Sequence, residues 1–199
     1  MRSFSRFVLE SLGNALWGFK PRLMREIVER LGPGGSLAWF ARNMPRYERT
    51  LKAWGPLRTH LTALAVSLAN SCGYCTYGHA FAFNLHFFSR REEVFPLDEK
   101  RLSELAIHEG EGWPRSLREA LLVAGLDDEV DHVARVFDLM AGDPPETEDD
   151  ERALHLVKMF GTLNYCGVDS KALPDQAHSP INKDAELKAR YAEARAADG

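Results

Sequence analysis

The stretch LRTHLTALAVSLANSCGYCTYGHAFAFNLHFF, residues 57–88, decides the fold class of this 199-residue chain. Apolar residues in its first half recur at a spacing of three and four, at Leu57, Leu61, Leu64, Ala65 and Leu68. That spacing places them on one face of an α-helix. After a polar break at 70–71, the segment from 72 to about 88 predicts a second helix. This helix is apolar on nearly every side, which is typical of a helix in the middle of a domain or an oligomer.

Helix breakers recur at helix-length intervals along the rest of the chain, and the segments between them have helical periodicity. We expect further helices over 22–31, 37 to about 54, 98 to about 110, 114–125, 127–140 and 151 to about 165, and a polar helix after Pro180. Pro45 is expected to kink or divide the second of these, and Gly55 and Pro56 to break the chain after it. No segment of the sequence alternates apolar and polar residues as a strand does.

The sequence therefore predicts a compact all-α protein. We expect a single domain over 1–199, with its core within 22–166 and with peripheral helices or tails at 1–20 and 181–199. A chain of this length can bury a core without disulfide bonds, because folding removes roughly 70% of the surface of the unfolded chain.

The composition excludes several classes of protein. A hydrophobic fraction of 45% and a charged fraction of 27% are ordinary for a globular protein. A net charge of −4 gives no basic surface for nucleic acid, and three cysteines are too few for a disulfide scaffold. The longest apolar run, 61–69, is far shorter than the roughly 20 residues of a membrane span. The amino terminus lacks a signal-peptide pattern, so we expect a cytoplasmic protein without a membrane or nucleic-acid partner.

Cys72 and Cys75 form the strongest chemical signal in the sequence. Two cysteines three residues apart at a helix start lie one turn apart, close enough for a disulfide, and the unpaired N–H groups of that helix end favour a thiolate. His79 follows Cys75 by four residues and therefore shares its face of the helix. An imidazole there can take up a thiol proton and return it to a leaving group. The spacing favours Cys75 as the attacking thiol and Cys72 as the resolving thiol.

Two other interpretations of this motif stay open. The cysteine pair and His79 could hold zinc, with Cys166 or His60 as the fourth ligand, or the two cysteines could be buried structural residues. A c-type haem is excluded, because Thr76 stands where haem attachment requires a histidine. We predict no metal and no cofactor for the preferred interpretation.

The remaining histidines and the third cysteine have simpler interpretations. His86 could extend a proton relay, but we expect a packed core histidine. Cys166 is expected to be a small buried side chain, with a third redox thiol as its alternative. Four histidines stand among charged residues and are expected at the surface: His108, His132, His155 and His178.

Residues 60–79 resemble the core of the alkylhydroperoxidase-D-like branch of the carboxymuconolactone decarboxylase family. That branch has the pattern Ala-Val-Ser-x-x-Asn-x-Cys-x-x-Cys-x-x-x-His, and this stretch matches it at every fixed position. The resemblance implies an all-helical fold that assembles into trimers or hexamers. It also implies that Cys75 attacks a peroxide, that Cys72 resolves the product and that His79 relays a proton. The family usually has a glutamate twelve residues before the first cysteine, and here His60 takes that place in the relay.

The predicted function is therefore that of a thiol-dependent oxidoreductase. Its substrate would be a peroxide or a disulfide, and its reductant a protein or a small thiol. The alternative is a non-catalytic helical oligomer whose cysteine pair is structural, zinc-binding or redox-sensing. We expect a homo-oligomer in either case, because residues 80–88 place aromatic rings on more faces than one helical domain can easily cover.

Overall fold

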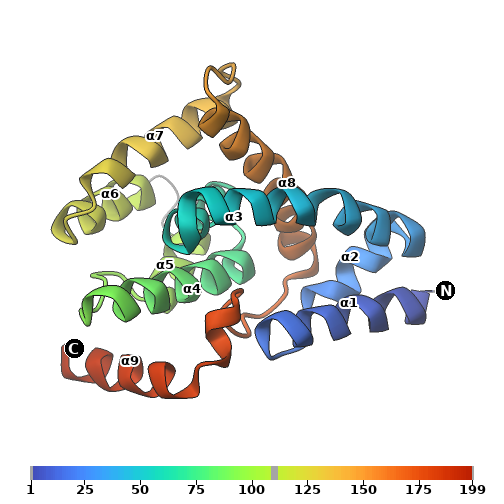
Figure 1. The fold of residues 1–199 in the computed structure, drawn as a ribbon, viewed down its shortest axis with the longest axis horizontal. Helices are drawn as coiled ribbons and strands as arrows, with labels where there is room; N and C mark the ends of the chain where they lie inside the picture. Colours follow the sequence, from blue (N-terminus) through green and yellow to red (C-terminus); the bar gives the residue numbers. More distant parts are fainter. Residues whose placement is uncertain (1, 109–111, 199) are drawn as a thin grey trace.

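The computed structural model describes residues 2–108 and 112–198. Within these ranges all regular structure is helical and no strand occurs, which confirms the all-α prediction (Figure 1). The elements in chain order are α1 (Arg2–Trp17), α2 (Leu23–Leu31), α3 (Pro33–Ala69), α4 (Gly73–Arg91), α5 (Glu99–His108), α6 (Trp113–Val123), α7 (Asp127–Ala141), α8 (Glu148–Ser170), the 3₁₀ helix η2 (Pro180–Lys183) and α9 (Ala185–Asp198). None of these described helices is both long and apolar enough to cross a membrane.

The long helix α3 contains the break that the sequence predicts at Gly55. This glycine has φ 78° and ψ 169°, which are not helical angles, so α3 consists of two helices that meet there. Its carbonyl accepts a hydrogen bond of 2.8 Å from the Thr59 hydroxyl at the start of the second helix. Pro45, in contrast, does not divide the first helix. It lies on the exposed face, where water can satisfy the carbonyl of Ala41 that the proline leaves unbonded.

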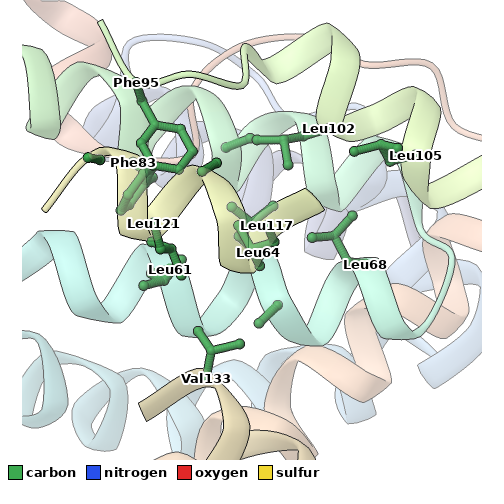
Figure 2. Close-up of a cluster of buried hydrophobic side chains, with 14 of the residues drawn as sticks. Leu61, Leu64, Leu68, Phe83, Phe95, Leu102, Leu105, Leu117, Leu121 and Val133 are labelled. Carbon is green, nitrogen blue, oxygen red and sulfur yellow. The ribbon is translucent and has the colours of Figure 1, made fainter. Parts of the chain in front are cut away.

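The main hydrophobic core lies where α3 and α4 pack against α5, α6 and α7. Only the three residues 70–72 join α3 to α4, so the two helices are neighbours in space as well as in sequence. Figure 2 shows this cluster of buried side chains, which includes Leu61, Leu64, Leu68, Phe83, Phe95, Leu102, Leu105, Leu117, Leu121 and Val133. Burying one such side chain contributes about 1.5–3 kcal/mol. The core therefore fixes the two helices that carry the cysteine motif.

The two ends of the chain cover faces that this core leaves open. At the N-terminal end, Leu9 of α1 is buried beside α2 and α3. At the C-terminal end, Leu187 and Tyr191 of α9 pack against α4. As a result Phe87 and Phe88 are only 2% and 4% exposed, whereas Phe81 stays half-buried. Helix α9 contacts Phe81 and Phe88 through Tyr191, so part of the cover that the sequence suggests for a second subunit comes from the same chain.

Candidate active site

The cysteine motif begins in the tight turn between α3 and α4. Ser71 has a positive φ of 53°, and this turn lets the Cys72 N–H donate to the Ser67 carbonyl at 3.0 Å. Cys72 then caps α4, because its sulfur accepts a hydrogen bond of 3.4 Å from the Cys75 N–H. The two sulfurs thus lie at the N-terminal end of α4, where the helix has free N–H groups and partial positive charge.

The sulfur atoms of Cys72 and Cys75 lie 2.7 Å apart, and both thiols are free and buried. A hydrogen bond from the Cys75 thiol, together with the Cys75 backbone N–H, lowers the pKa of Cys72 from its ordinary value. Burial raises the pKa of Cys75 well above its ordinary value, and the hydrogen bond to Cys72 adds to this effect. Of the two thiols, Cys72 therefore has the lower pKa, a distinction that the residue spacing does not reveal.

Helix α8 packs against the thiol pair at Gly167. A Cβ atom at Gly167 would lie 2.6 Å from the Cys72 sulfur and 3.3 Å from the Cys75 sulfur, so no larger residue fits without movement. The neighbouring Cys166 belongs to the same buried cluster, and burial raises the pKa of its thiol. Cys166 is thus a small buried side chain, as its sequence context predicts.

An apolar cavity of about 50 Å³ lies beside Cys75. Its polar side chains include Tyr47 of α3, Tyr74, Cys75 and His79 of α4, and His178 of the segment before η2. The rest of its wall is apolar and comes from α1, α2, α3 and α8, with Trp17, Met24, Ile27, Phe40, Phe160 and Leu163 among the lining residues. Cys75 lines this cavity and Cys72 does not, because the Cys72 sulfur lies against α8.

His79 and His60 are brought together at this site. Their Nδ1 atoms lie 3.4 Å apart, so one ring can donate a hydrogen bond to the other. Burial lowers the pKa of both rings well below the ordinary value, and neighbouring histidines lower it further. Both rings are therefore neutral near pH 7, and His60 does not titrate between pH 6 and 8 as its ordinary pKa of about 6.5 would suggest. His86 stacks on His60 with 5.6 Å between ring centroids, and burial lowers the pKa of His86 to about 4.

Three histidines expected at the surface are instead buried or half-buried. His178 and His155 are 7% and 6% exposed, and half-buried His132 bonds to the Thr62 hydroxyl at 2.8 Å. The surface prediction is wrong for these residues because segments distant in sequence cover them. The corresponding prediction for the His108 side chain lies outside the described residues.

Two functional candidates of the C-terminal segment were missed from the sequence. Asp175 accepts hydrogen bonds from the Tyr74 hydroxyl and the Arg22 N–H, each at 3.0 Å, and its other oxygen lies 3.4 Å from Nε2 of His178. The ring of His178 reaches the cavity, 5.2 Å from the ring centroid of His79. The spacing of an aspartate and a histidine three residues apart was a signal, but nothing local connected it with the cysteines.

The donors near the thiol pair do not form a metal site. Within residues 2–108 and 112–198, no group of three or more histidine, cysteine, aspartate or glutamate residues is arranged to hold a metal ion. The zinc interpretation, which needs Cys72, Cys75, His79 and a fourth ligand together, therefore has no support from the geometry.

Comparison with protein-family models, with curated protein sequences and with solved structures finds no match to this chain. The fold and the site thus define an all-helical protein with a buried dithiol, an apolar cavity and a histidine cluster. The family resemblance of residues 60–79 remains a prediction that rests on those residues.

Proposed function

We propose that the protein is a thiol-dependent oxidoreductase, a peroxidase or a disulfide reductase, whose Cys72 and Cys75 cycle between dithiol and disulfide. The observation that carries the proposal is the pair of free sulfurs 2.7 Å apart at the start of α4, beside a cavity that Cys75 lines. The resemblance of residues 60–79 to alkylhydroperoxidase-D-like proteins supports the same chemistry.

In the peroxidase reaction, Cys75 loses its proton and attacks the terminal oxygen of the peroxide. A sulfur–oxygen bond forms, the oxygen–oxygen bond breaks, and the departing oxygen takes up a proton to give an alcohol or water. Cys72 then attacks the Cys75 sulfenic acid and forms the disulfide, and the proton of the Cys72 thiol joins the departing hydroxyl group, which leaves as water. A reductant protein or small thiol returns two electrons and two protons to the pair, and is itself oxidised to a disulfide.

The histidines support this reaction by moving the proton of Cys75. His79 lines the same cavity as Cys75, and as a neutral ring it can accept that proton. His60 lies within hydrogen-bonding distance of His79 and so helps to set its tautomer and orientation. The carboxylate that this position holds in the resembling family is absent, so His60 positions His79 without adding negative charge.

The same resemblance leads us to propose a cytoplasmic homo-oligomer, a trimer or hexamer. In the cytoplasm thiol reductants are available to reset the pair. Helix α1 offers exposed apolar side chains for contact between subunits, since Phe4 and Phe7 are 67% and 63% exposed. Light scattering should give a mass that is a multiple of three chains, and a mass near 22.4 kDa at micromolar concentration would contradict the assembly.

The function is tested by counting reactive thiols and by following peroxide consumption with a small dithiol as reductant. The wild-type protein should consume an alkyl hydroperoxide, and Cys75→Ser should abolish consumption. Cys72→Ser should trap Cys75 as a sulfenic acid that dimedone labels. Cys166→Ser is the matched control and should turn over normally. Bound zinc that resists dialysis, with both thiols of the motif unreactive, would instead establish the structural alternative.

A further inference from the structure

The segment between α8 and α9 crosses to α4 (Figure 1). It brings His178 to the cavity and Asp175 to the side of that ring. The N–H of His178 donates to the Gly78 carbonyl at 3.0 Å, which ties this segment to α4 one turn beyond Cys75. The absence of a side chain at Gly78 is required here, because a Cβ atom would lie 2.4 Å from the imidazole ring of His178. The ring thus rests directly on the backbone of α4.

Asp175 is a buried carboxylate whose hydrogen-bonding partners keep it charged. Its side chain is 9% exposed. It accepts bonds from the N–H groups of Arg22 and Gln176 at 3.0 and 2.9 Å and from the Tyr74 hydroxyl at 3.0 Å. Burial alone would raise the pKa of Asp175, but the bonds from His178 and from the two backbone N–H groups lower it.

The His178 ring is held between Asp175 and the cavity. Its Nε2 atom lies 3.4 Å from the Asp175 carboxylate, and Trp17 stacks on the ring with 5.5 Å between centroids and 19° between planes. The ring meets His79 nearly at a right angle, with 5.2 Å between centroids. An imidazole whose one nitrogen is fixed by a carboxylate can use its other nitrogen for proton transfer, and the carboxylate stabilises its protonated form.

We propose that His178 is the general acid of this site, with Asp175 as the residue that positions its ring and stabilises its protonated form. The inference rests on the proposed function, because the reacting sulfur is that of Cys75. His79 accepts the Cys75 proton, and His178 delivers a proton to the oxygen that leaves when the oxygen–oxygen bond breaks. The proton on His79 then passes to His178 between the adjoining rings. The sum of these steps converts a thiol and a hydroperoxide into a sulfenic acid and an alcohol.

The two histidines divide these tasks because their surroundings differ. His79 is packed edge-on against Phe160 and lies beside the neutral ring of His60, which favours an uncharged base. His178 instead has one ring nitrogen held by the carboxylate of Asp175, which fixes the orientation of the ring that is to donate the proton. A base and an acid on the same cavity are thus created by environment rather than by residue type. Asp175 supplies a negative charge beside His178, whereas His60 supplies none beside His79.

The test compares two oxidants that differ in their need for an acid. Cleavage of tert-butyl hydroperoxide releases an alkoxide, which needs a proton, whereas cleavage of peracetic acid releases acetate, which does not. The rate of sulfenic acid formation on Cys75 is measured by stopped-flow fluorescence for wild type, His178→Gln and Asp175→Asn. His132→Gln is the matched control, because it removes a half-buried histidine outside the cavity.

We expect His178→Gln to slow the reaction with tert-butyl hydroperoxide about 100-fold or more, and the reaction with peracetic acid less than about tenfold. Asp175→Asn should show the same imbalance to a smaller extent and serves if His178→Gln does not fold. Equal loss with both oxidants, or no loss, would overturn the acid role while leaving the thiol chemistry intact. A wild-type protein that reacts with neither oxidant and reduces no disulfide would overturn the proposed function and this inference together.

Discussion

Substitution of Gly167 by alanine tests whether α8 packs directly on the thiol pair. The new methyl group would lie 2.6 Å from the Cys72 sulfur and 3.3 Å from the Cys75 sulfur, so either α8 or the two sulfur atoms must move. Inserting a methyl group into a packed core costs about 1–3 kcal/mol. Gly161→Ala on the same helix is the matched control, because no described atom lies within 4 Å of its Cβ position. That change should stabilise α8 by up to about 1 kcal/mol.

The difference between the two variants is measured by thermal unfolding of the reduced protein. About 1 kcal/mol shifts the Tm by roughly 2–4 °C in a chain of this size. Because both substitutions gain the same helix propensity, the variants differ by the cost of the added methyl group, and we expect Gly167→Ala to unfold about 2–12 °C below Gly161→Ala. Displacing the Cys72 sulfur should also weaken its hydrogen bond from the Cys75 thiol, so the pKa of Cys72 should rise in Gly167→Ala alone. Equal Tm values and unchanged alkylation profiles in the two variants would refute the packing of α8 on the sulfurs.

Three further predictions follow from the pKa shifts and the core. The pH profile of Cys72 alkylation by iodoacetamide should have its midpoint below that of an ordinary thiol. Cys75→Ala should raise this midpoint, because the hydrogen bond between the two thiols is lost. A midpoint that Cys75→Ala leaves unchanged would show that Cys75 does not lower the pKa of Cys72. Burial lowers the pKa values of His60 and His79, so below about pH 6.5 the unfolded chain binds more protons than the folded protein. The free energy of unfolding should therefore decrease as the pH is lowered from 6.5, by at most about 1.4 kcal/mol per histidine and pH unit. A urea midpoint that stays constant between pH 7 and 5 would show that these rings are solvated. Leu64→Ala should cost about 2–5 kcal/mol in urea unfolding, because Leu64 is fully buried in the main core; a cost below about 1 kcal/mol would place it outside the core.

Local patterns predicted the parts of the fold that depend on local interactions. The spacing of apolar residues indicated the helices, and the break at Gly55 followed from its proline neighbour and its access to positive φ. Pro45 does not divide the helix, because the cost of a helical proline depends on whether its unbonded carbonyl is exposed, which is a tertiary property. The polar helix α9 was expected but its role was not, since only the fold shows that Leu187 and Tyr191 cover α4.

The candidate site divides in the same way. Cys72, Cys75 and His79 stand within eight residues of one another, so helical geometry was enough to associate them. His60 came from a family pattern, and the structure places it 3.4 Å from His79. Asp175 and His178 lie about a hundred residues further along the chain, and a single sequence carries no signal of so distant a contact. The difference in pKa between the two thiols was also hidden, because it arises from their hydrogen bond and from burial rather than from spacing.

Disulfide mapping after stoichiometric oxidation tests the proposed chemistry most directly. The fully reduced protein is treated with one equivalent of tert-butyl hydroperoxide, alkylated under denaturing conditions and digested for mass spectrometry. We predict a disulfide between Cys72 and Cys75, with Cys166 alkylated and with both thiols of the pair restored by a dithiol reductant. Cys72 and Cys75 recovered as alkylated thiols after the peroxide has been offered, or joined to other partners, would contradict the proposal.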